Sequence, residues 1–505
     1  MDKINKFSEK YRNYIFWFFL IAVFLILDYQ TILFLRPQGI HFIRQTDCLS
    51  IVANYFNNDL SFFQPQVFNL QSTDGKAASE FPILYYLTAI LYYLFNEHEF
   101  ILRLITIIIV STGFFYLFKL IYILLQDFLY ALGFSFLFIS STVLLYYTNN
   151  FLPDASALGL TLIGWYFFFY FIKNKVRKTS LLLSFVFFTL ASLIKITFFI
   201  NPITAVFSLI IFEISNKVSL KSLFKKNFIL FVVFTSSIII VLSWNLYVNY
   251  YNKINHNNCF LAHSIPIWGI SKTQIIEVWG YIADYWYSKY YYQTTFHVFL
   301  LIIVVGSIFF KKASKIILIQ SLLLTIGTVC YFLLFYPQFK DHDYYFITLI
   351  PAIIFLVINS FITLKNKFPK LISNILTKLL LITICILSLN YAREKLVQRY
   401  KNTDDKFAII GCKLSHTKHY LDSLGISKNA KFIIISDLSV NGGLYFINRQ
   451  GWSVKDTSKQ SIATIKNYIE KGVDYVLFTE QKYVFSNFNG LKIGEENGNL
   501  IYKIK

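Results

Sequence analysis

Long apolar runs alternate with short charged segments along most of the chain. Between about residues 14 and 390 the runs approach 20 residues, the length of an α-helix that crosses the ~30 Å hydrocarbon core of a bilayer. About eleven such spans can be drawn. They cover about 14–34, 100–124, 128–147, 155–172, 180–198, 199–214, 227–247, 295–310, 316–336, 346–364 and 371–390. The pattern predicts an α-helical polytopic membrane protein.

The first long loop, about 36–99, is too polar to span a membrane continuously. Within it, apolar residues recur at helical spacing over 48–56, which predicts a short amphipathic helix lying on the membrane surface. A second such helix is expected to start at Pro82 and to cover 83–95, where several tyrosines suit the interface. We therefore expect two interfacial helices in the first outer loop.

From about residue 392 the apolar runs shorten to the length of strands. The runs 431–436, 444–448 and 473–479 predict strands, and 458–471 has the spacing of an amphipathic helix. Glycines separate these segments. The chain is thus expected to hold a membrane domain over 1–391 and a small soluble α/β domain over 392–505.

Composition and charge agree with this division. The 505 residues are 56% hydrophobic and 19% aromatic, with a net charge of +20; the mean hydropathy is +0.53. The lysines sit in short clusters between apolar runs, as at 173–178 and 217–226, which argues against nucleic acid as a partner. The five cysteines contain no CxxC pair and imply neither a disulfide framework nor a zinc site, which leaves open a single bridge among Cys48, Cys259 and Cys412.

Charge also predicts the orientation. With the N-terminus inside, the dense Lys/Arg clusters between spans fall on the cytoplasmic side, and the long loops that carry carboxylates fall on the other side. Low Met and high Lys, Asn, Phe and Ile are typical of an AT-rich bacterial genome. We expect a protein of the bacterial inner membrane with a cytoplasmic N-terminus and a periplasmic C-terminal domain.

Polar residues of the outer face are the candidates for chemistry, since a charge near the bilayer is costly unless it is paired or lines a wet cavity. Arg44 and Asp47 follow the first span, three residues apart. Asp47 has two interpretations: the opening cap of a helix, or a reactive carboxylate. Glu80, just before Pro82, is either an acid of a first helical turn or a substrate ligand.

Further candidates stand at the outer ends of later spans. Asp154 could start a helix or line a site, Lys195 could extend to the surface or bind an anion, and Arg103 could anchor the interface. One turn is dense in polar groups: Asp341, His342, Asp343, Tyr344 and Tyr345. It fits a metal site, a phosphate or sugar site, or a solvated turn. The Trp and Tyr residues of 248–294 form a membrane belt or stack on sugars.

These residues, in this order and on one side of the membrane, resemble a family. The layout is similar to GT-C glycosyltransferases of the dolichyl-phosphate-mannose–protein mannosyltransferase and lipid A aminoarabinose transferase kind. The resemblance covers about 14–390. It rests on the runs 44–47, 80–86, 102–104, 152–154 and 342–345, with Lys195 late in the fifth span.

The resemblance implies a GT-C fold and transfer of a sugar from a polyprenyl-phosphate donor to a lipid, glycan or protein acceptor at the outer face. It makes Asp47 the catalytic carboxylate, either the general base or the group that orients the acceptor. The donor phosphate is expected to contact Lys195, Arg103 and His342. Expected contacts of the substrate or a metal are Arg44, Glu80, Asp154, Asp341, Asp343, Tyr344 and Tyr345.

One departure concerns Glu80, because the aminoarabinose transferases have a lysine before the prolines of the second interfacial helix. That difference weakens a lipid A assignment and leaves the phosphate contact at this position open. The sequence specifies no cofactor and leaves metal dependence open, since the acids could hold Mg²⁺ or Mn²⁺. We expect these polar groups to share one layer at the outer face.

The working hypothesis is an inverting, lipid-linked sugar transferase. A transporter or flippase of lipid-linked sugars is the alternative, and it would favour two similar halves and broken helices at mid-membrane. A third hypothesis is a noncatalytic protein of envelope assembly.

Overall fold

The computed structural model describes residues 2–173, 178–257, 259–260, 264–401, 407–485 and 488–504, so most of the basic segment 173–178 lies outside the described residues. The chain divides into two compact units. The first, here called the helical unit, comprises Met1–Leu33, Arg103–Trp244 and His263–Val397. The second, called the mixed unit, comprises Phe34–Leu102, Asn245–Ala262 and Gln398–Lys505.

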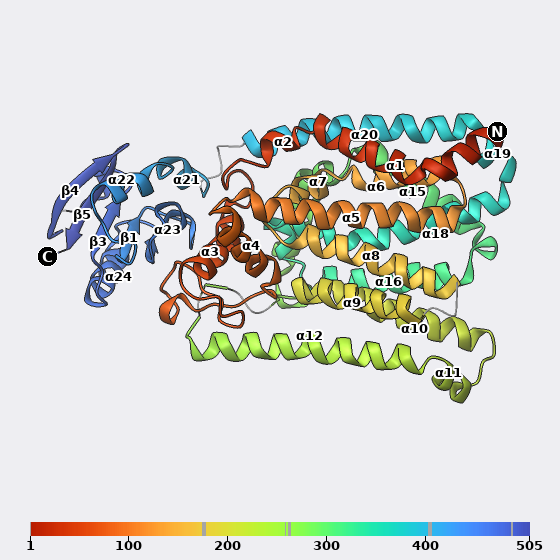
Figure 1. Ribbon diagram of the computed structural model, residues 1–505, viewed down its shortest axis with the longest axis horizontal. Helices are drawn as coiled ribbons and strands as arrows, with labels where there is room; N and C mark the ends of the chain where they lie inside the picture. Colours follow the sequence, from red (N-terminus) through yellow and green to blue (C-terminus); the bar gives the residue numbers. More distant parts are fainter. Residues whose placement is uncertain are drawn as a thin grey trace. The chain divides into compact units, whose positions relative to one another are not determined.

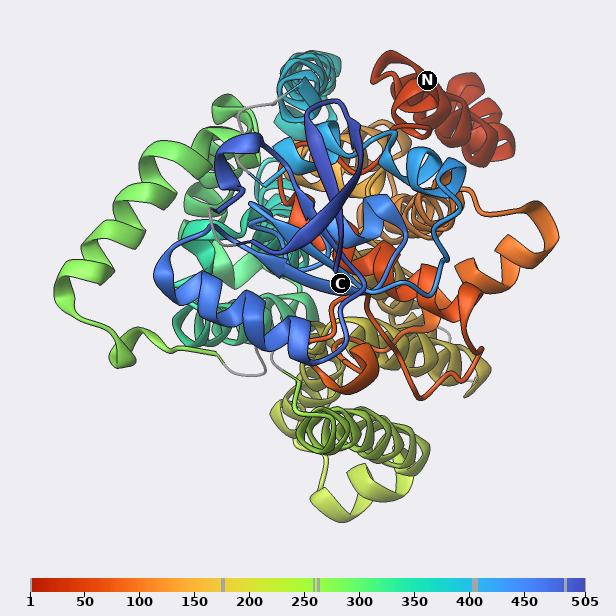
Figure 2. The ribbon, with the colours of Figure 1, turned by 90° about the vertical axis from the view of Figure 1, so that its left-hand side faces the viewer.

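Long helices dominate the helical unit; they run side by side in Figure 1 and are seen nearly end-on in Figure 2. The helices are α1 (Asp2–Ile26), α2 (Tyr29–Ile32), α5 (Phe100–Leu125), α6 (Phe128–Ile139), α7 (Thr142–Thr148), α8 (Asp154–Lys173), α9 (Lys178–Ile194), α10 (Ile200–Ser215), α11 (Leu220–Lys226), α12 (Phe228–Ile254), α13 (Lys272–Tyr281), α14 (Tyr287–Tyr290), α15 (Gln293–Ile308), α16 (Lys315–Leu334), α17 (Gln338–Asp341), α18 (Ile350–Lys367), α19 (Pro369–Ser373) and α20 (Ile375–Lys401). Short 3₁₀ or π turns are η2 (Ile196–Phe199), η3 (Ile267–Gly269), η4 (Ile282–Trp286), η5 (Phe310–Lys312) and η6 (Asp343–Leu349).

Within the described residues, seven helices are long and apolar enough to cross a membrane, and up to nine if each of two bent helix pairs counts as one span. The bent pairs are α6 with α7, at 79°, and Lys272–Tyr290 with α15, at 97°. The two other predicted spans lie on α1 and on α9, which has only 17 residues. The membrane-helical class is confirmed, with fewer full-length spans than the sequence predicts.

Close packing in the helical unit depends on small residues and aromatic rings. A Cβ added at Gly113 of α5 would lie 2.5 Å from the Cα of Gly159 of α8, so only glycine allows the two backbones to approach this closely. Trp165 of α8 is fully buried and donates its indole N–H to Oδ1 of Asn201 at 2.8 Å. Helices α5, α8 and α10 are thereby held in a fixed packing.

The mixed unit contains a small α/β fold, in which β1 is buried on both faces, and the two helices of the predicted first outer loop. The helices are α3 (Phe42–Asn57), α4 (Ile83–Phe95), α21 (Ile409–Lys413), α22 (Thr417–Ser423), α23 (Gly442–Ile447) and α24 (Lys459–Glu470), with the turns η1 (Thr73–Gly75) and η7 (Gln481–Tyr483). The strands are β1 (Phe432–Ile435), β2 (Gly451–Val454), β3 (Tyr475–Phe478), β4 (Gly490–Glu496) and β5 (Asn499–Ile504). Figure 2 turns this sheet toward the viewer.

The sheet has the order β2-β1-β3-β5-β4. Strand β1 pairs in parallel with β2 and β3, while β5 is antiparallel to β3 and β4. The predicted strands 431–436 and 473–479 correspond to β1 and β3, and the predicted helix 458–471 is α24. The strand predicted at 444–448 is wrong, because this fully buried run belongs to α23, the helical crossover between two parallel strands.

Three sequence segments build the mixed unit together. The loop 68–70 extends the edge of β2, since Leu70 N–H donates to the carbonyl of Gly451 at 2.7 Å and Gly451 N–H donates to the carbonyl of Phe68 at 3.0 Å. The side chain of Asn252, near the end of α12, both accepts from Ala78 N–H and donates to its carbonyl. The first outer loop is therefore hydrogen-bonded to the C-terminal sheet.

Candidate active site

Asp47 lies in the second turn of α3 and not at its start. The helix begins at Phe42, directly after His41, whose backbone is left-handed at φ 59°. The interpretation of Asp47 as an opening cap is therefore wrong, since its carboxylate is too far along the helix to satisfy the first free N–H groups. The residue is only 4% exposed. A buried carboxylate without a capping role needs another explanation.

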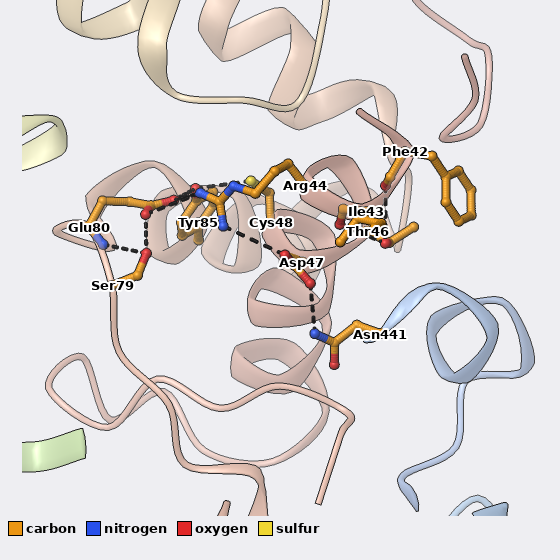
Figure 3. A network of polar contacts seen from close by, with 10 residues as sticks. All are labelled: Phe42, Ile43, Arg44, Thr46, Asp47, Cys48, Ser79, Glu80, Tyr85 and Asn441. Atoms are coloured by element: carbon orange, nitrogen blue, oxygen red, sulfur yellow. Dashed lines mark hydrogen bonds and ion pairs between the residues drawn. The ribbon is translucent and has the colours of Figure 1, made fainter. Parts of the chain in front are cut away.

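Arg44 joins the two predicted acids of the mixed unit. Its Nη2 lies 3.1 Å from Oε1 of Glu80, and its Nη1 lies 3.6 Å from Oδ2 of Asp47 (Figure 3). Glu80 also accepts from the hydroxyl groups of Ser79 and Tyr85. The side chains of Arg44, Asp47 and Glu80 thus form one network, in which a single guanidinium serves two carboxylates.

A fourth member of this network comes from the C-terminal domain. The side-chain amide of Asn441 donates to Oδ1 of Asp47 at 2.7 Å, from the start of α23 (Figure 3). Asn441 was not predicted from the sequence, because the run 441–452 carries little functional information. Its Asn-Gly-Gly turn after a buried strand is the one local signal, and it predicts a turn without indicating a partner.

Burial chiefly raises the pKa of Asp47, from 3.8 to about 6. The positive charge of Arg44 and the hydrogen bond from Asn441 act in the opposite direction, and the negative charge of Glu80 adds to the rise. At neutral pH the carboxylate is therefore mostly ionised, yet it binds a proton more readily than an ordinary aspartate. These are the properties of a general base.

A second polar cluster lies in the helical unit. Lys195 was predicted inside the fifth span, but α9 ends at Ile194, and Lys195 is extended (φ −146°) between α9 and η2. Its Nζ lies 3.0 Å from Oδ1 of Asp154, the first residue of α8, which is 1% exposed. The same ammonium lies 5.2 Å and 5.1 Å from the ring centres of Tyr344 and Tyr345.

The predicted turn 341–345 divides into buried and exposed parts. Asp343 is fully buried and accepts from the hydroxyl of Tyr147 at 2.6 Å. The ring of His342 stacks on that of Tyr345, with centres 5.7 Å apart. Asp341 is exposed at the end of α17. The helical unit therefore brings together Asp154, Lys195, Tyr344 and Tyr345, with His342 beside the tyrosines, and leaves Asp341 at the surface.

Arg103 has contacts of a different kind. Its side chain is fully buried in α5, its guanidinium donates to the carbonyl of Ile32, and it lies 4.1 Å from the ring centre of Phe151. These contacts join α5 to the last residue of α2 and to the loop before α8. The expected contact of Arg103 with a phosphate stays a prediction, as does the expectation that the predicted groups share one layer.

The acidic side chains of the predicted site could also bind a metal ion. Among the residues that the structure describes, no group of three or more His, Cys, Asp or Glu side chains is placed to hold a metal ion. The carboxylates of both clusters instead contact Arg44, Lys195, Asn441 and tyrosine hydroxyls. A requirement for Mg²⁺ or Mn²⁺ stays a prediction.

Part of the chain is similar in sequence to a known protein family. The sequence model of the dolichyl-phosphate-mannose-protein mannosyltransferase family matches residues 79–244. A search of curated protein sequences finds no significant match. The matched segment contains Glu80, Arg103, Asp154 and Lys195, so one sequence pattern covers residues of both units.

Solved structures resemble nearly the whole chain. ArnT from Cupriavidus metallidurans bound to undecaprenyl phosphate is similar with a TM-score of 0.61 at 10% identity, over 96% of this chain and 98% of that chain. The oligosaccharyltransferase of Archaeoglobus fulgidus in its apo form is similar with a TM-score of 0.52 at 12% identity, over 91% and 69%. Tethered to an acceptor peptide, it gives a TM-score of 0.50 at 13% identity, over 94% and 69%. The chain is therefore a multi-pass membrane protein with the fold of the GT-C glycosyltransferases.

Proposed function

We propose that the protein is an inverting glycosyltransferase of the bacterial inner membrane. It moves a sugar from a polyprenyl-phosphate carrier to a lipid, glycan or protein acceptor at the periplasmic face. The GT-C fold supports this proposal, as does the undecaprenyl phosphate bound in the similar ArnT structure. The observation that carries it is the buried carboxylate of Asp47, whose pKa of about 6 suits a base at neutral pH.

In the proposed step, Asp47 takes the proton of the acceptor nucleophile. The electron pair released on the acceptor forms a bond to the anomeric carbon, on the face opposite the carrier. The bond between that carbon and the phosphate oxygen breaks at the same time, and the phosphate leaves with the electron pair. Since a phosphate is a weak base, its departure needs no proton donor, and one base together with a cation is sufficient.

Lys195 is the proposed cation for the donor phosphate. Its pairing with Asp154 at 3.0 Å fixes the ammonium at the break between α9 and η2, and the faces of Tyr344 and Tyr345 lie beside it. A lysine is a compact charge whose three donors can each face a different oxygen, which suits a phosphate. His342, stacked on Tyr345, is proposed to assist as a hydrogen-bond donor.

Asp47→Asn is the direct test. The amide keeps the shape of the side chain but cannot take a proton, so we expect transfer to fall by at least about 10²-fold. The purified variant and the wild type would be assayed with a panel of polyprenyl-phosphate sugars and periplasmic extract as acceptor. Membrane insertion and elution as a single species should be unchanged. Normal transfer by the variant would contradict a catalytic role for Asp47.

Asp59→Asn provides the matched control. Asp59 lies in the same predicted outer loop just after α3, but it is exposed and, among the described residues, accepts only a local hydrogen bond from Ser61. The same charge is removed while the network of Asp47 is untouched, so transfer should persist. If the wild type moves lipid-linked sugars across vesicle membranes and transfers none of them to an acceptor, the transporter alternative holds instead.

A further inference from the structure

We propose that Asn441 is a positioning residue for Asp47, so that the C-terminal domain completes the catalytic group of the first outer loop. The proposal rests on the proposed function, because it assigns Asn441 a role through Asp47. Asn441 is fully buried, and its amide Nδ2 lies 2.7 Å from Oδ1 of Asp47. An amide donor at this distance fixes the rotation of the carboxylate and favours its ionised form.

The orientation of the Asn441 amide is determined by its other end. Its Oδ1 accepts from the backbone N–H of Asn69 at 3.0 Å, so the NH₂ group is the end that faces Asp47. Asn69 in turn donates its own side-chain amide to the carbonyl of Val440 at 2.7 Å. A reversed Asn441 amide would place N–H against N–H and an oxygen against the carboxylate, which makes that orientation unfavourable.

The loop that carries Asn441 is stabilised by hydrogen bonds to a buried aspartate, Asp437. Asp437, 2% exposed, accepts from the N–H and hydroxyl of Ser439 at 2.8 and 2.6 Å and from the N–H of Gly443 at 3.0 Å. The hydroxyl of Ser453 in β2 also donates to Asp437. A buried carboxylate with this many donors makes a rigid turn at the end of β1. The backbone of Asn441 is therefore held in one position by this turn.

A close approach of α23 to α3 brings the amide within reach. A Cβ added at Gly442 would lie 2.6 Å from a ring carbon of Phe42, the first residue of α3, so the absence of a side chain at 442 permits the contact. The carbonyl of Phe68 and the N–H of Leu70 bond to Gly451 at the β2 edge of the sheet. The junction is thus built from backbone pairing and packing as well as from the Asn441 amide.

The chemical consequence concerns which oxygen of Asp47 remains available. Asn441 occupies Oδ1, while Oδ2 lies toward Arg44 at the longer distance of 3.6 Å. Oδ2, which has the longer of these two contacts, is the oxygen assigned here to receive the acceptor proton. Other titratable or charged groups near the carboxylate are Arg44 and Cys48 of α3, Glu80, Tyr85 of α4, and Cys259. Asn441 differs from all of these groups, because its amide stabilises the carboxylate without titrating.

Asn441→Ala tests the role through the pH dependence of transfer. Loss of the donor should raise the pKa of Asp47, and a base must be ionised to act, so the acid limb of kcat/KM should move to higher pH by about one unit. Transfer should be strongly reduced near pH 6 and should largely recover as the pH rises. A residue that only supports the fold would lower the rate at every pH and leave the limb in place.

Two further variants keep the test decisive. Asn441→Asp preserves the volume and an oxygen for Asn69 N–H but sets a second carboxylate against Asp47, so it should move the acid limb upward even further. Gln450→Ala is the matched control. The side-chain amide of Gln450 also donates a hydrogen bond from the C-terminal domain to α3, but to Oδ1 of Asn54 at 3.3 Å and not to Asp47. The acid limb of this variant should coincide with that of the wild type.

The outcomes separate this inference from the proposed function. An unmoved acid limb in both Asn441 variants, alongside an inactive Asp47→Asn, would overturn the role of Asn441 and leave the base in place. Equal displacement by Gln450→Ala would also overturn it, since any loosening of the junction would then suffice. Normal transfer by Asp47→Asn would remove the proposed function itself.

Discussion

Ionised Asp47 is expected to lower the stability of the folded chain at neutral pH. Its pKa is about 6 when folded and 3.8 ordinarily, and burial is the main cause. Because the folded state binds this proton more tightly than the unfolded state, protonated Asp47 stabilises the fold. That contribution is complete below about pH 4 and is lost as the pH rises through about 6. At neutral pH the ionised group is expected to cost up to ~3 kcal/mol of folding free energy.

Asp47→Asn should therefore be more stable than the wild type at neutral pH, by up to ~3 kcal/mol. The amide oxygen can still accept from Asn441, and position 47 then holds no buried charge. Near pH 4 the advantage should vanish, because the wild-type carboxyl is then neutral too. Thermal unfolding in detergent at both pH values would measure the difference. A variant less stable than the wild type at neutral pH would show that the ion pair with Arg44 outweighs the burial of the charge.

Residue patterns in the sequence could bring Arg44, Asp47 and Glu80 together because all three belong to one outer loop. The same reading could not find Asn441, which is 394 positions from Asp47 along the chain. Asparagine after a strand usually makes a turn, and nothing in the local pattern distinguishes a turn that also binds a remote carboxylate. Contacts at such separation depend on how the chain folds back, which hydrophobic periodicity does not record.

The ends of some helices differ from the ends predicted from their apolar runs. The fifth span was expected to include Lys195, but α9 stops one residue earlier and the chain passes through an extended residue into η2. No proline or glycine marks this break; the nearest proline is Pro202, inside α10. The pairing of Lys195 with Asp154 is a tertiary interaction that overrides local helix propensity.

Lys195 and Asp154 should stabilise the packing of α8 against α9 as a pair. Lys195→Met removes the cation and leaves the carboxylate of Asp154, which is 1% exposed, without its ion-pair partner. We expect a loss of ~3 kcal/mol in the free energy of unfolding. The thermal unfolding midpoint of the purified protein in detergent would report it.

The double variant Lys195→Met with Asp154→Asn distinguishes the energy of the Lys195–Asp154 interaction from the separate contribution of each side chain. With both charges removed, much of the lost stability should return, because no buried charge remains. Transfer should stay low in the double variant, since the proposed phosphate contact is still missing. Stability equal to that of Lys195→Met alone would show that the two side chains act independently.

At the scale of the whole molecule, each compact unit is built from segments that are far apart in the sequence. The sequence predicts domains over 1–391 and 392–505, a boundary that stays a prediction. The mixed unit joins Phe34–Leu102 and Asn245–Ala262 with Gln398–Lys505. Changes in composition along a chain reveal where the local character changes, as it does near 392. They do not reveal that an early loop folds with a late domain, because that association depends on long-range backbone pairing.

Gly451 is the residue at which this association should be most sensitive. Its φ is +156°, and an added Cβ would lie 1.8 Å from the carbonyl oxygen of Phe432 in β1. Gly451→Ala must therefore displace β2, and with it the backbone bonds to Phe68 and Leu70. We expect faster amide hydrogen exchange in β1, in the loop 66–71 and in α3, together with reduced transfer.

Gly472→Ala is the appropriate comparison. Gly472 also has positive φ, at +86°, but an added Cβ would meet nothing within 4 Å, so only the backbone strain of about 1 kcal/mol is introduced. Exchange should then rise only around the turn between α24 and β3, and transfer should persist. If Gly451→Ala likewise altered exchange only within the C-terminal sheet, the first outer loop would not depend on that sheet for its stability, and the proposed support of Asp47 by the C-terminal domain would lose its structural basis.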